Sequence, residues 1–184
     1  LFFFYPVQTN NPKNYIPQNL VEQIESKSEI VANGINNYWL ANAYHKKSND
    51  LKKLNLIYAG RIDKNKNVKT ICKLVEQLNS EGIKAGLKII GSGPEKENIA
   101  EYISSKKEIK LLDFMSQKEL LKNYRKSDIF IMPSYNETFG LVYIEAMSQG
   151  LPIIYTENEG VDGYFEEGSV GYAVAPDDIS DMVE

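Results

Sequence analysis

From residue 51 onward, short apolar runs alternate with longer segments in which apolar residues recur at helical spacing. This alternation is typical of βαβ units and of a parallel sheet with helices on both faces. Strands are expected at residues 54–59, 87–90, 109–114, 129–132 and 152–155, with a weaker one at 172–174. The chain is therefore predicted to have an α/β fold, a Rossmann-like doubly wound parallel sheet.

Helices are expected in the gaps between these strands. Apolar residues in the first gap form one face of a helix; they are Val68, Ile71, Cys72, Val75 and Leu78. Pro94 suits the first turn of a second helix, and apolar residues within 120–124 mark a third. A fourth is expected over residues 139–149, because Gly150 follows it as a stop signal.

Residues 1–50 lack this regularity and are rich in Asn, Lys and Tyr, with one helix expected around residues 20–25 and a short strand at 30–32. We interpret residues 1–50 as an interdomain linker and the remnant of an N-terminal domain, and residues 51–184 as one α/β domain. The closing stretch DISDMVE looks like the start of a helix, so we expect this domain to be truncated at its C-terminus and to belong to a longer protein.

The composition argues against several classes of function. A net charge of −4 and a pI near 5.2 disfavour nucleic acid as a partner, since nucleic-acid-binding surfaces are usually basic. No apolar run approaches the roughly eighteen residues that a membrane helix needs. With a single cysteine, Cys72, and a single histidine, His45, the chain offers neither an internal disulfide nor a cluster of metal ligands. We therefore expect a cytoplasmic protein that needs no metal.

Charged residues follow the first expected strand, at the sheet edge where the ligands of open α/β sheets bind. The loop GRIDKNKN, residues 60–67, carries Arg61 and Lys66 ahead of a helix. An Arg fork, a Lys point charge and a helix N-terminus together suit a phosphate or diphosphate. The alternative is a solvated basic loop, since Lys64 lies there too.

Two glycines follow the next strand in GSGP, residues 91–94, and allow the backbone to approach a ligand closely. The third glycine of the dinucleotide-binding pattern is missing, because residue 96 is Lys. We therefore expect no nicotinamide or flavin site. The alternative is that Gly91 and Gly93 only form a tight turn into a helix at Pro94.

The stretch NETFGLVYIEAMSQGLP, residues 136–152, contains two carboxylates on either side of a turn and a helix start. Free backbone N–H groups at residues 139–141 suit a phosphate or sugar oxygen. Glu137 and Glu145 can each accept hydrogen bonds from sugar hydroxyls, so the two would bracket one elongated polar ligand. The alternative is that Glu137 is an exposed loop acid and that Glu145 is paired with an Arg or Lys of the core.

Taken together and in this order, the motifs resemble the C-terminal domain of family 4 (group 1) retaining glycosyltransferases of the GT-B fold. The resemblance rests on Gly60-Arg61 with Lys66, on GSGP, and on two glutamates eight residues apart before AMSQGLP. It covers roughly residues 29–184, and VANGINNYW, residues 31–39, is similar to the family's interdomain segment. The resemblance implies a single C-terminal domain that binds a nucleotide sugar.

The resemblance also implies a role for each matching residue. Arg61, Lys66 and Glu137 would be catalytic: the two cations would hold the diphosphate and offset the charge on the leaving group, and Glu137 would bind hydroxyls of the transferred sugar. Glu145 would bind the ribose hydroxyls. Further contacts with the substrate would come from Gly60, Gly91, Gly93, Phe114, Met115, Thr138, Phe139, Gly140 and Leu141, with Phe114 and Met115 nearest the base.

The implied reaction transfers a sugar from UDP-, GDP- or ADP-sugar to an acceptor with retention of anomeric configuration, without a cofactor or metal. The acceptor, a glycan or a lipid-linked molecule of surface polysaccharide synthesis, would bind to an N-terminal domain that residues 1–28 are too few to form. The isolated chain is therefore expected to bind donor weakly and to transfer nothing. The alternatives are a non-catalytic sugar-nucleotide-binding module and a sugar-nucleotide epimerase of GT-B shape.

The chain departs from the family pattern at three places. Asp113 stands where the family usually has Gly before the base-lining residue, and Glu159 replaces the first of two glycines after the following strand. Gly163 and Tyr164 stand where the family often has an acidic and an aliphatic residue. These changes bear on the base preference and on the contact of the later loop with the ligand.

A basic helical face suggests one further partner. Lys118, Lys122 and Arg125 are expected to share one side of a helix, which would allow weak peripheral contact with the inner face of a membrane. The favoured alternative is a solvated face.

Overall fold

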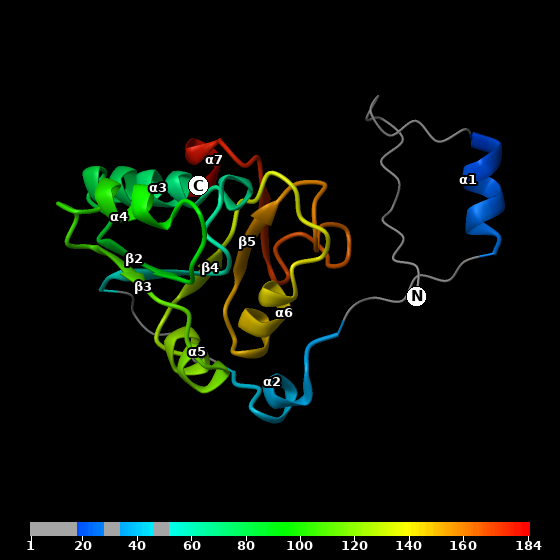
Figure 1. Cartoon of the computed structure of the whole chain (residues 1–184), viewed down its shortest axis with the longest axis horizontal. Coiled ribbons are helices and arrows are strands. Elements are labelled where there is room, and N and C mark those ends of the chain that lie inside the picture. The colour runs from blue at the N-terminus through cyan, green and yellow to red at the C-terminus, as the bar shows by residue number, and fades with distance from the viewer. Residues whose placement is uncertain (1–17, 28–33, 46–51) are drawn as a thin grey trace. The chain divides into compact units, whose positions relative to one another are not determined.

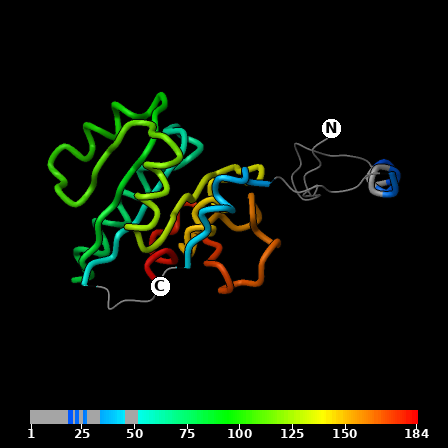
Figure 2. The backbone as a smooth tube through the Cα atoms, turned by 90° about the horizontal axis from the view of Figure 1, so that it is seen from below, coloured from blue at the N-terminus to red at the C-terminus, as the bar shows by residue number. Residues whose placement is uncertain are grey.

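The computed structural model describes residues 18–27, 34–45 and 52–184 of the chain. The chain divides into two compact units, Leu1–Gly34 and Ile35–Glu184. The first unit contains the helix α1, Gln18–Glu25, close to the helix expected around residues 20–25. The remaining described elements belong to the second unit (Figures 1 and 2).

A six-stranded parallel sheet forms the centre of the second unit. Its strands are β1 (Leu54–Ala59), β2 (Ala85–Ile90), β3 (Ile109–Leu112), β4 (Ile129–Ile131), β5 (Ile153–Thr156) and β6 (Gly171–Val174). The strand order is β3-β2-β1-β4-β5-β6, so the chain builds outward from β1 to β3 and then continues on the other side of β1. In Figure 2 the green segments accordingly lie to one side and the yellow to orange segments to the other. The predicted α/β class and doubly wound sheet are confirmed.

The central strands are apolar runs because both faces of the sheet are covered. β1 reads LNLIYA and its last four residues are buried, while β2 reads AGLKII and is buried except for a partly exposed Lys88. The two strands pair in register from Leu54 opposite Ala85 to Ala59 opposite Ile90. β1 has its predicted bounds, whereas β2 begins at Ala85 rather than at residue 87.

Helices cover both faces of this sheet (Figure 1). On one side lie α3 (Val68–Ser80), α4 (Lys96–Tyr102) and α7 (Ile179–Val183), and on the other lie α2 (Asn37–Ala41), α5 (Gln117–Tyr124) and α6 (Leu141–Ser148). α3 buries the apolar face that its spacing predicts, including the free thiol of Cys72. A 3-10 helix, η1 (Lys64–Lys66), precedes α3. α5 starts with a capping box, in which Ser116 and Glu119 each bond the backbone N–H of the other.

The second unit begins at Ile35, whereas the sequence pattern places the start of the regular domain at residue 51. The difference comes from α2, because its residue Trp39 is fully buried in the hydrophobic core. The N–H of Tyr44 donates to the carbonyl of Ser148 at 2.9 Å, which ties the segment after α2 to the end of α6. A five-residue helix is too short to show periodicity, so the pattern alone assigns it to the linker.

Two elements near the site have bounds that differ from the prediction. The third strand ends at Leu112 rather than at residue 114, so Asp113 and Phe114 lie in a loop. The helix α6 begins at Leu141 rather than at residue 139, because Gly140 before it has a left-handed backbone with φ of 73°. The strand expected at residues 30–32 lies outside the described residues.

The basic face expected around α5 is incomplete. Lys118 and Lys122 are exposed, but Arg125 donates from Nε to Gln149 Oε1 at 3.0 Å and from a terminal nitrogen to the carbonyl of Asn42 at 2.7 Å. Arg125 is thus bonded within the protein, and contact of this face with a membrane stays a prediction. Within the described ranges, no helix is both long and apolar enough to cross a membrane.

Candidate functional site

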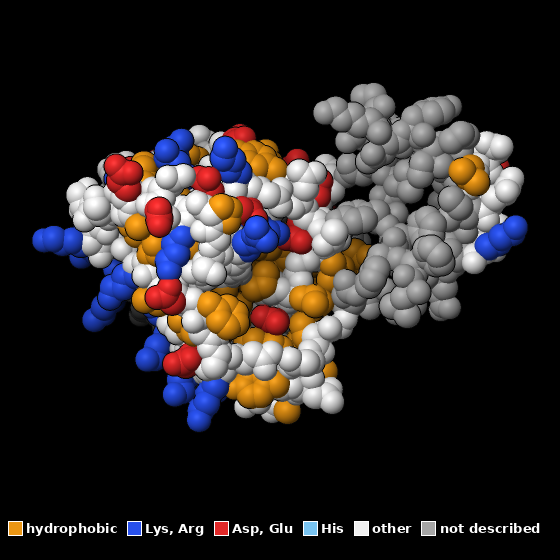
Figure 3. Space-filling view, viewed as in Figure 1, with side chains coloured by type: hydrophobic (Ala, Val, Ile, Leu, Met, Phe, Trp, Pro, Cys, Tyr) orange, Lys and Arg blue, Asp and Glu red, His pale blue; other side chains and the backbone are white. Residues whose placement is uncertain are grey.

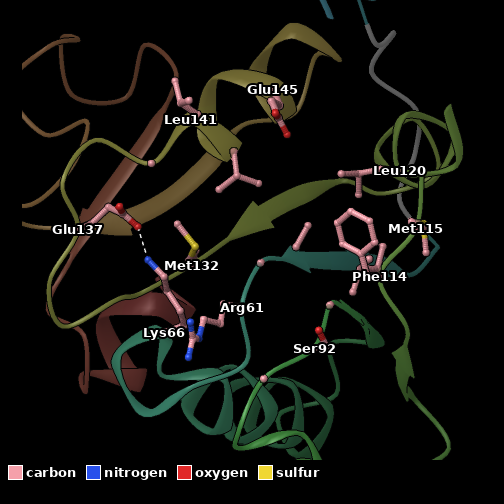
Figure 4. A pocket seen from close by; sticks show the side chains of 17 residues that line it. Arg61, Lys66, Ser92, Phe114, Met115, Leu120, Met132, Glu137, Leu141 and Glu145 are labelled. Atoms are coloured by element: carbon pink, nitrogen blue, oxygen red, sulfur yellow. Dashed lines mark hydrogen bonds and ion pairs between the residues drawn. The ribbon is translucent and has the colours of Figure 1, made fainter. Parts of the chain in front are cut away.

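A cavity of about 640 Å³ opens beside the carboxyl ends of β1, β2 and β4 and the N-terminus of α6. Small-molecule sites commonly enclose about 300–1,000 Å³. Apolar side chains gather around a hollow in the face shown in Figure 3, with acidic and basic side chains beside it. The cavity is lined by Ala59, Gly60, Arg61, Lys66, Ile90, Gly91, Ser92, Gly93, Phe114, Met115, Leu120, Met132, Glu137, Gly140, Leu141, Val142 and Glu145 (Figure 4).

The strand order explains this position. β1 and β4 are neighbours in the sheet, but the chain leaves β1 in one direction to reach β2 and later returns to reach β4. At such a switch point the loops after the two strands diverge and leave a crevice outside the carboxyl ends of the strands. All of the predicted site residues except Thr138 and Phe139 line the cavity that results.

The loop after β1 presents Arg61 and Lys66 on one side of the cavity. The hydroxyl of Tyr58 donates to the carbonyl of Arg61 at 2.6 Å, and Asp63 Oδ1 accepts from the N–H of Lys66 at 3.0 Å. The Arg61 side chain is 71% exposed and lies 3.3 Å from Asp63, a loose surface contact that a ligand can replace. The loop backbone is thus held in place while the guanidinium stays available.

Lys66 and Glu137 form a largely buried ion pair. Lys66 Nζ lies 2.6 Å from Glu137 Oε2, and the two side chains are only 19% and 9% exposed (Figure 4). Asn65 joins the two loops: its carbonyl accepts from the N–H of Tyr135, and its side chain bonds both the N–H and the carbonyl of Asn136. The alternative that Glu137 is an exposed loop acid is therefore wrong.

The N-terminus of α6 faces the cavity beside Glu137. Gly140 holds the turn in the left-handed region, and a Cβ there would lie 2.4 Å from Cδ2 of Tyr143. The Tyr143 hydroxyl in turn donates to the carbonyl of Met132 at 2.6 Å, which fixes α6 to the end of β4. Within the part of the chain that the structure describes, the N–H groups of Phe139, Gly140 and Leu141 donate to no other group. They remain available to a ligand.

Glu145 lies one helical turn further along α6 and lines the other end of the cavity (Figure 4). Burial raises the pKa of its carboxyl group. Glu145 makes no ion pair with any described residue, so the alternative of pairing with a core Arg or Lys is wrong.

The glycines after β1 and β2 allow two loops to run against each other. The N–H of Ile62 donates to the carbonyl of Ser92 at 2.9 Å, so the loops are hydrogen-bonded. A Cβ on Gly91, whose φ is 146°, would lie 1.9 Å from the carbonyl oxygen of Gly60. The absence of a side chain is therefore required by loop packing as well as by any ligand. Both readings of GSGP, ligand approach and turn formation, are compatible with this geometry.

The far end of the cavity is apolar and partly open. Phe114 is 83% exposed, and Met115 and Leu120 line the cavity beside it. Asp113 is exposed and forms an ion pair with Lys96 from α4, so its carboxylate does not line the cavity. An exposed aromatic ring at the mouth of a cavity suits stacking on a planar ligand.

Two predicted site residues do not line the cavity with their side chains, and one contact was missed. Thr138 is exposed, and the ring of Phe139 packs edge-on against Tyr164, with centroids 5.4 Å apart, rather than lining the cavity. Glu159, at one of the family departures, accepts from the N–H of Glu137 at 2.8 Å and so helps to hold that loop. No sequence signal marks this contact, because it depends on how two loops meet in space. Among the described residues, no group of three or more His, Cys, Asp and Glu side chains could hold a metal ion.

Most of the chain matches a single family model. Residues 41–184 match the model described as glycosyl transferases group 1. Among curated proteins, the sulfoquinovosyl transferase SQD2 of Arabidopsis thaliana is 31% identical over 131 residues, which are 70% of this chain and 25% of that protein. The chain thus spans about a quarter of the length of this relative.

Solved structures show the same fold. The lipopolysaccharide outer core galactosyltransferase WaaB superposes with a TM-score of 0.74 at 20% identity, over 90% of this chain and 47% of that one. The pneumococcal O-GlcNAc transferase GtfA, solved in complex with UDP and GlcNAc, superposes with a TM-score of 0.61 at 25% identity, over 74% of this chain and 29% of that one.

Proposed function

The chain belongs to the group 1 glycosyl transferases and has the fold of the C-terminal domain of GT-B enzymes, and we propose that its cavity binds the nucleotide sugar donor of a glycosyltransferase. One observation carries the proposal: two carboxylates, Glu137 and Glu145, lie at separate points of one cavity with Arg61 and Lys66 beside them. A nucleotide sugar has the matching order of groups, with hydroxyls on both sides of a diphosphate. The complex of GtfA with UDP and GlcNAc supports this class of ligand.

Each group in the cavity has a chemical task under this proposal. Arg61 and Lys66 bind the diphosphate, and the free N–H groups ahead of α6 add partial positive charge where the leaving group gains negative charge. Glu145 accepts from the ribose hydroxyls and Phe114 stacks on the base. Glu137 exchanges its ion pair with Lys66 for hydroxyls of the transferred sugar as the diphosphate approaches Lys66.

The acceptor site completes the proposed enzyme but lies outside this cavity. We propose that an N-terminal domain supplies it, and that the sugar is transferred with retention of configuration to a glycan or lipid-linked acceptor in surface polysaccharide synthesis. The isolated chain then binds donor and transfers nothing. A cytoplasmic location fits such a donor and the buried free thiol of Cys72.

Donor binding can be tested by thermal unfolding of the chain with UDP, GDP and ADP. A ligand at about one hundred times its Kd adds about 2.7 kcal/mol to the free energy of unfolding, so the Tm should rise with at least one of the three. The rise should be absent in Arg61→Ala, because the diphosphate loses a charge-assisted contact.

Lys64→Ala is the matched control, since Lys64 belongs to the same loop but is exposed and does not line the cavity. It should keep the rise in Tm. No rise with any of the three diphosphates at millimolar concentration would contradict the proposal, as would a rise of the same size in Arg61→Ala.

A further inference from the structure

One face of the sheet carries adjacent lysines on neighbouring strands. Lys88 on β2 and Lys110 on β3 are partners in the parallel register, so their side chains lie side by side on the same face. Lys88 is half-buried and Lys110 is exposed. Like charges on adjacent strands repel each other and destabilise the pairing. The two lysines therefore do not serve the stability of the sheet.

Lys53 adds a third ammonium group to this face. A Cβ on Gly86 would lie 2.8 Å from both Cε and Nζ of Lys53, so the end of the Lys53 side chain lies against the bare backbone of this glycine. Gly86 and Lys88 are two residues apart on β2 and therefore lie on the same face. The charge of Lys53 is thus added beside that of Lys88.

The end of α5 brings a fourth lysine to this corner of the sheet. The exposed Lys126 comes just after α5, and two residues later the N–H of Asp128 donates to the carbonyl of Asn55, at the start of β1, at 2.7 Å. Burial lowers the pKa of Lys88, and the charges of Lys126 and Lys110 lower it further. Ammonium groups are therefore crowded here.

Together these side chains form one surface, the lysine face, which consists of Lys53, Lys88, Lys110, Lys122 and Lys126. Lys122 is exposed and lies one turn before Lys126 along α5. None of the five forms an ion pair with any residue that the structure describes. Lys and Arg side chains are visible along the margin where β2, β3 and α5 lie (Figures 1 and 3). The chain as a whole has a net charge of −4, so the lysine face is a local excess of positive charge.

Acidic neighbours do not pair with the lysine face. The carboxylate of Asp128 accepts from the backbone N–H and from the side chain of Asn55, at 2.8 and 2.9 Å. Glu108, two residues before Lys110, forms no ion pair with a described residue. The charge of the lysine face therefore remains available to an external anion.

An anionic membrane surface fits this arrangement. The lysine face contains no arginine, whose planar fork suits bidentate recognition of one phosphate, and the nearby Arg125 is bonded to Gln149 and Asn42. Lysines on flexible side chains instead act as point charges, each attracted by the negative potential of anionic lipids. The chemistry thus favours a layer of lipid headgroups over a single bound phosphate.

The lysine face and the cavity lie on the same side of the sheet. Ile90 lies two residues after Lys88 on β2, and therefore on the same face, and it lines the cavity together with Leu120 of α5. A membrane in contact with the lysine face would therefore lie on the side of the sheet that also carries the cavity.

We propose that the lysine face holds the protein against a membrane surface rich in anionic lipids. The attraction comes from the ammonium groups and requires no nucleotide, so it is independent of the proposed donor site. The surface differs from the basic face expected from the sequence, because Arg125 takes no part in it and the strand residues Lys88 and Lys110 do.

Sedimentation with phospholipid vesicles tests this inference. The chain should bind vesicles that mix phosphatidylcholine with phosphatidylglycerol, but not vesicles of phosphatidylcholine alone. Added salt should weaken the binding, because it screens the charges. The double variant Lys110→Gln with Lys126→Gln should bind the mixed vesicles about thirtyfold less tightly, since each lysine near an anionic surface contributes about fivefold. Its Tm should be no lower than that of the wild type, because the repulsion of Lys88 is reduced.

The double variant Lys69→Gln with Lys73→Gln is the matched control. It removes the same charge from exposed positions on α3, on the other side of the sheet, and should leave vesicle binding nearly unchanged. No binding to the mixed vesicles, equal binding to both kinds of vesicle, or an equal loss in the two double variants would overturn the inference. Binding of polyphosphate or single-stranded DNA through Lys110 and Lys126, without vesicle binding, would overturn it in favour of a soluble polyanion.

Discussion

Replacing Lys66 by methionine should destabilise the chain, because it leaves the carboxylate of Glu137 buried without its cation. The two groups are 2.6 Å apart and their side chains are 19% and 9% exposed. Removing one partner of a buried ion pair typically costs about 3–5 kcal/mol. We expect about 3 kcal/mol, the low end of this range, since Glu137 Oε1 still accepts from the N–H of Thr138.

The loss should be visible as a lower Tm and as a lower urea midpoint. For a domain of this size each kcal/mol corresponds to about 2–4 °C, so Lys66→Met should lower the Tm by about 6–12 °C. The matched variant is the double substitution Lys66→Met with Glu137→Gln, which removes both charges while keeping both side-chain lengths. It should recover most of the lost stability, because the cost comes from the unpaired carboxylate.

The Lys66 and Glu137 variants should also differ in their affinity for the nucleoside diphosphate. Glu137→Gln frees Lys66 from its partner and removes a negative charge near the diphosphate, so the preferred nucleoside diphosphate should bind more tightly, by about tenfold for a gain of about 1.4 kcal/mol. Lys66→Met should lower the affinity for the same nucleoside diphosphate. The reasoning is refuted if Lys66→Met costs less than about 1 kcal/mol, or if the double variant is as unstable as the single one.

Three further outcomes are expected. Burial raises the pKa of Glu145, so the charged carboxylate destabilises the fold above that raised pKa. Glu145→Gln should therefore have a higher Tm than the wild type at neutral pH. The difference in Tm should disappear as the pH falls through the raised pKa of Glu145, where the wild-type carboxyl group becomes neutral. Nucleoside diphosphate affinity, measured by calorimetry, should fall more steeply over the same acidic range in the wild type than in Glu145→Gln, because the ligand's phosphate titrates in both but Glu145 only in the wild type. Gly140→Ala should cost about 1–3 kcal/mol in urea unfolding, and more than Gly163→Ala, because both glycines have positive φ but only the first would press a Cβ against Tyr143. EDTA should leave the ligand-induced rise in Tm unchanged, since Arg61 and Lys66 supply the positive charge; loss of the rise would point to a metal.

The sheet could be predicted from the sequence because buried parallel strands are continuous apolar runs. β1 has its predicted bounds for this reason, and the helices between strands show the expected periodicity. The start of β2 was missed because Ala85 and Gly86 are weak strand formers that pair with β1 all the same. The start of α6 was misplaced because the left-handed Gly140 delays the helix.

The cavity could be predicted in part because topology brings the loops after neighbouring strands together. The order of the motifs along the sequence therefore predicted that Arg61, Lys66 and Glu145 lie at one cavity, without knowledge of any contact. The burial of Trp39 and the contact of Glu159 could not be inferred in this way. Trp39 lies on a helix too short to show a period, and Glu159 meets the N–H of a residue 22 positions away only after both loops have folded.

The most direct test of the central claim is a crystal structure of the chain with the nucleoside diphosphate that gives the largest rise in Tm. We expect the diphosphate within hydrogen-bond distance of Arg61 and Lys66, the ribose hydroxyls on Glu145 and the base against Phe114. A nucleotide bound outside this cavity, or inside it with the ribose away from Glu145, would contradict the account.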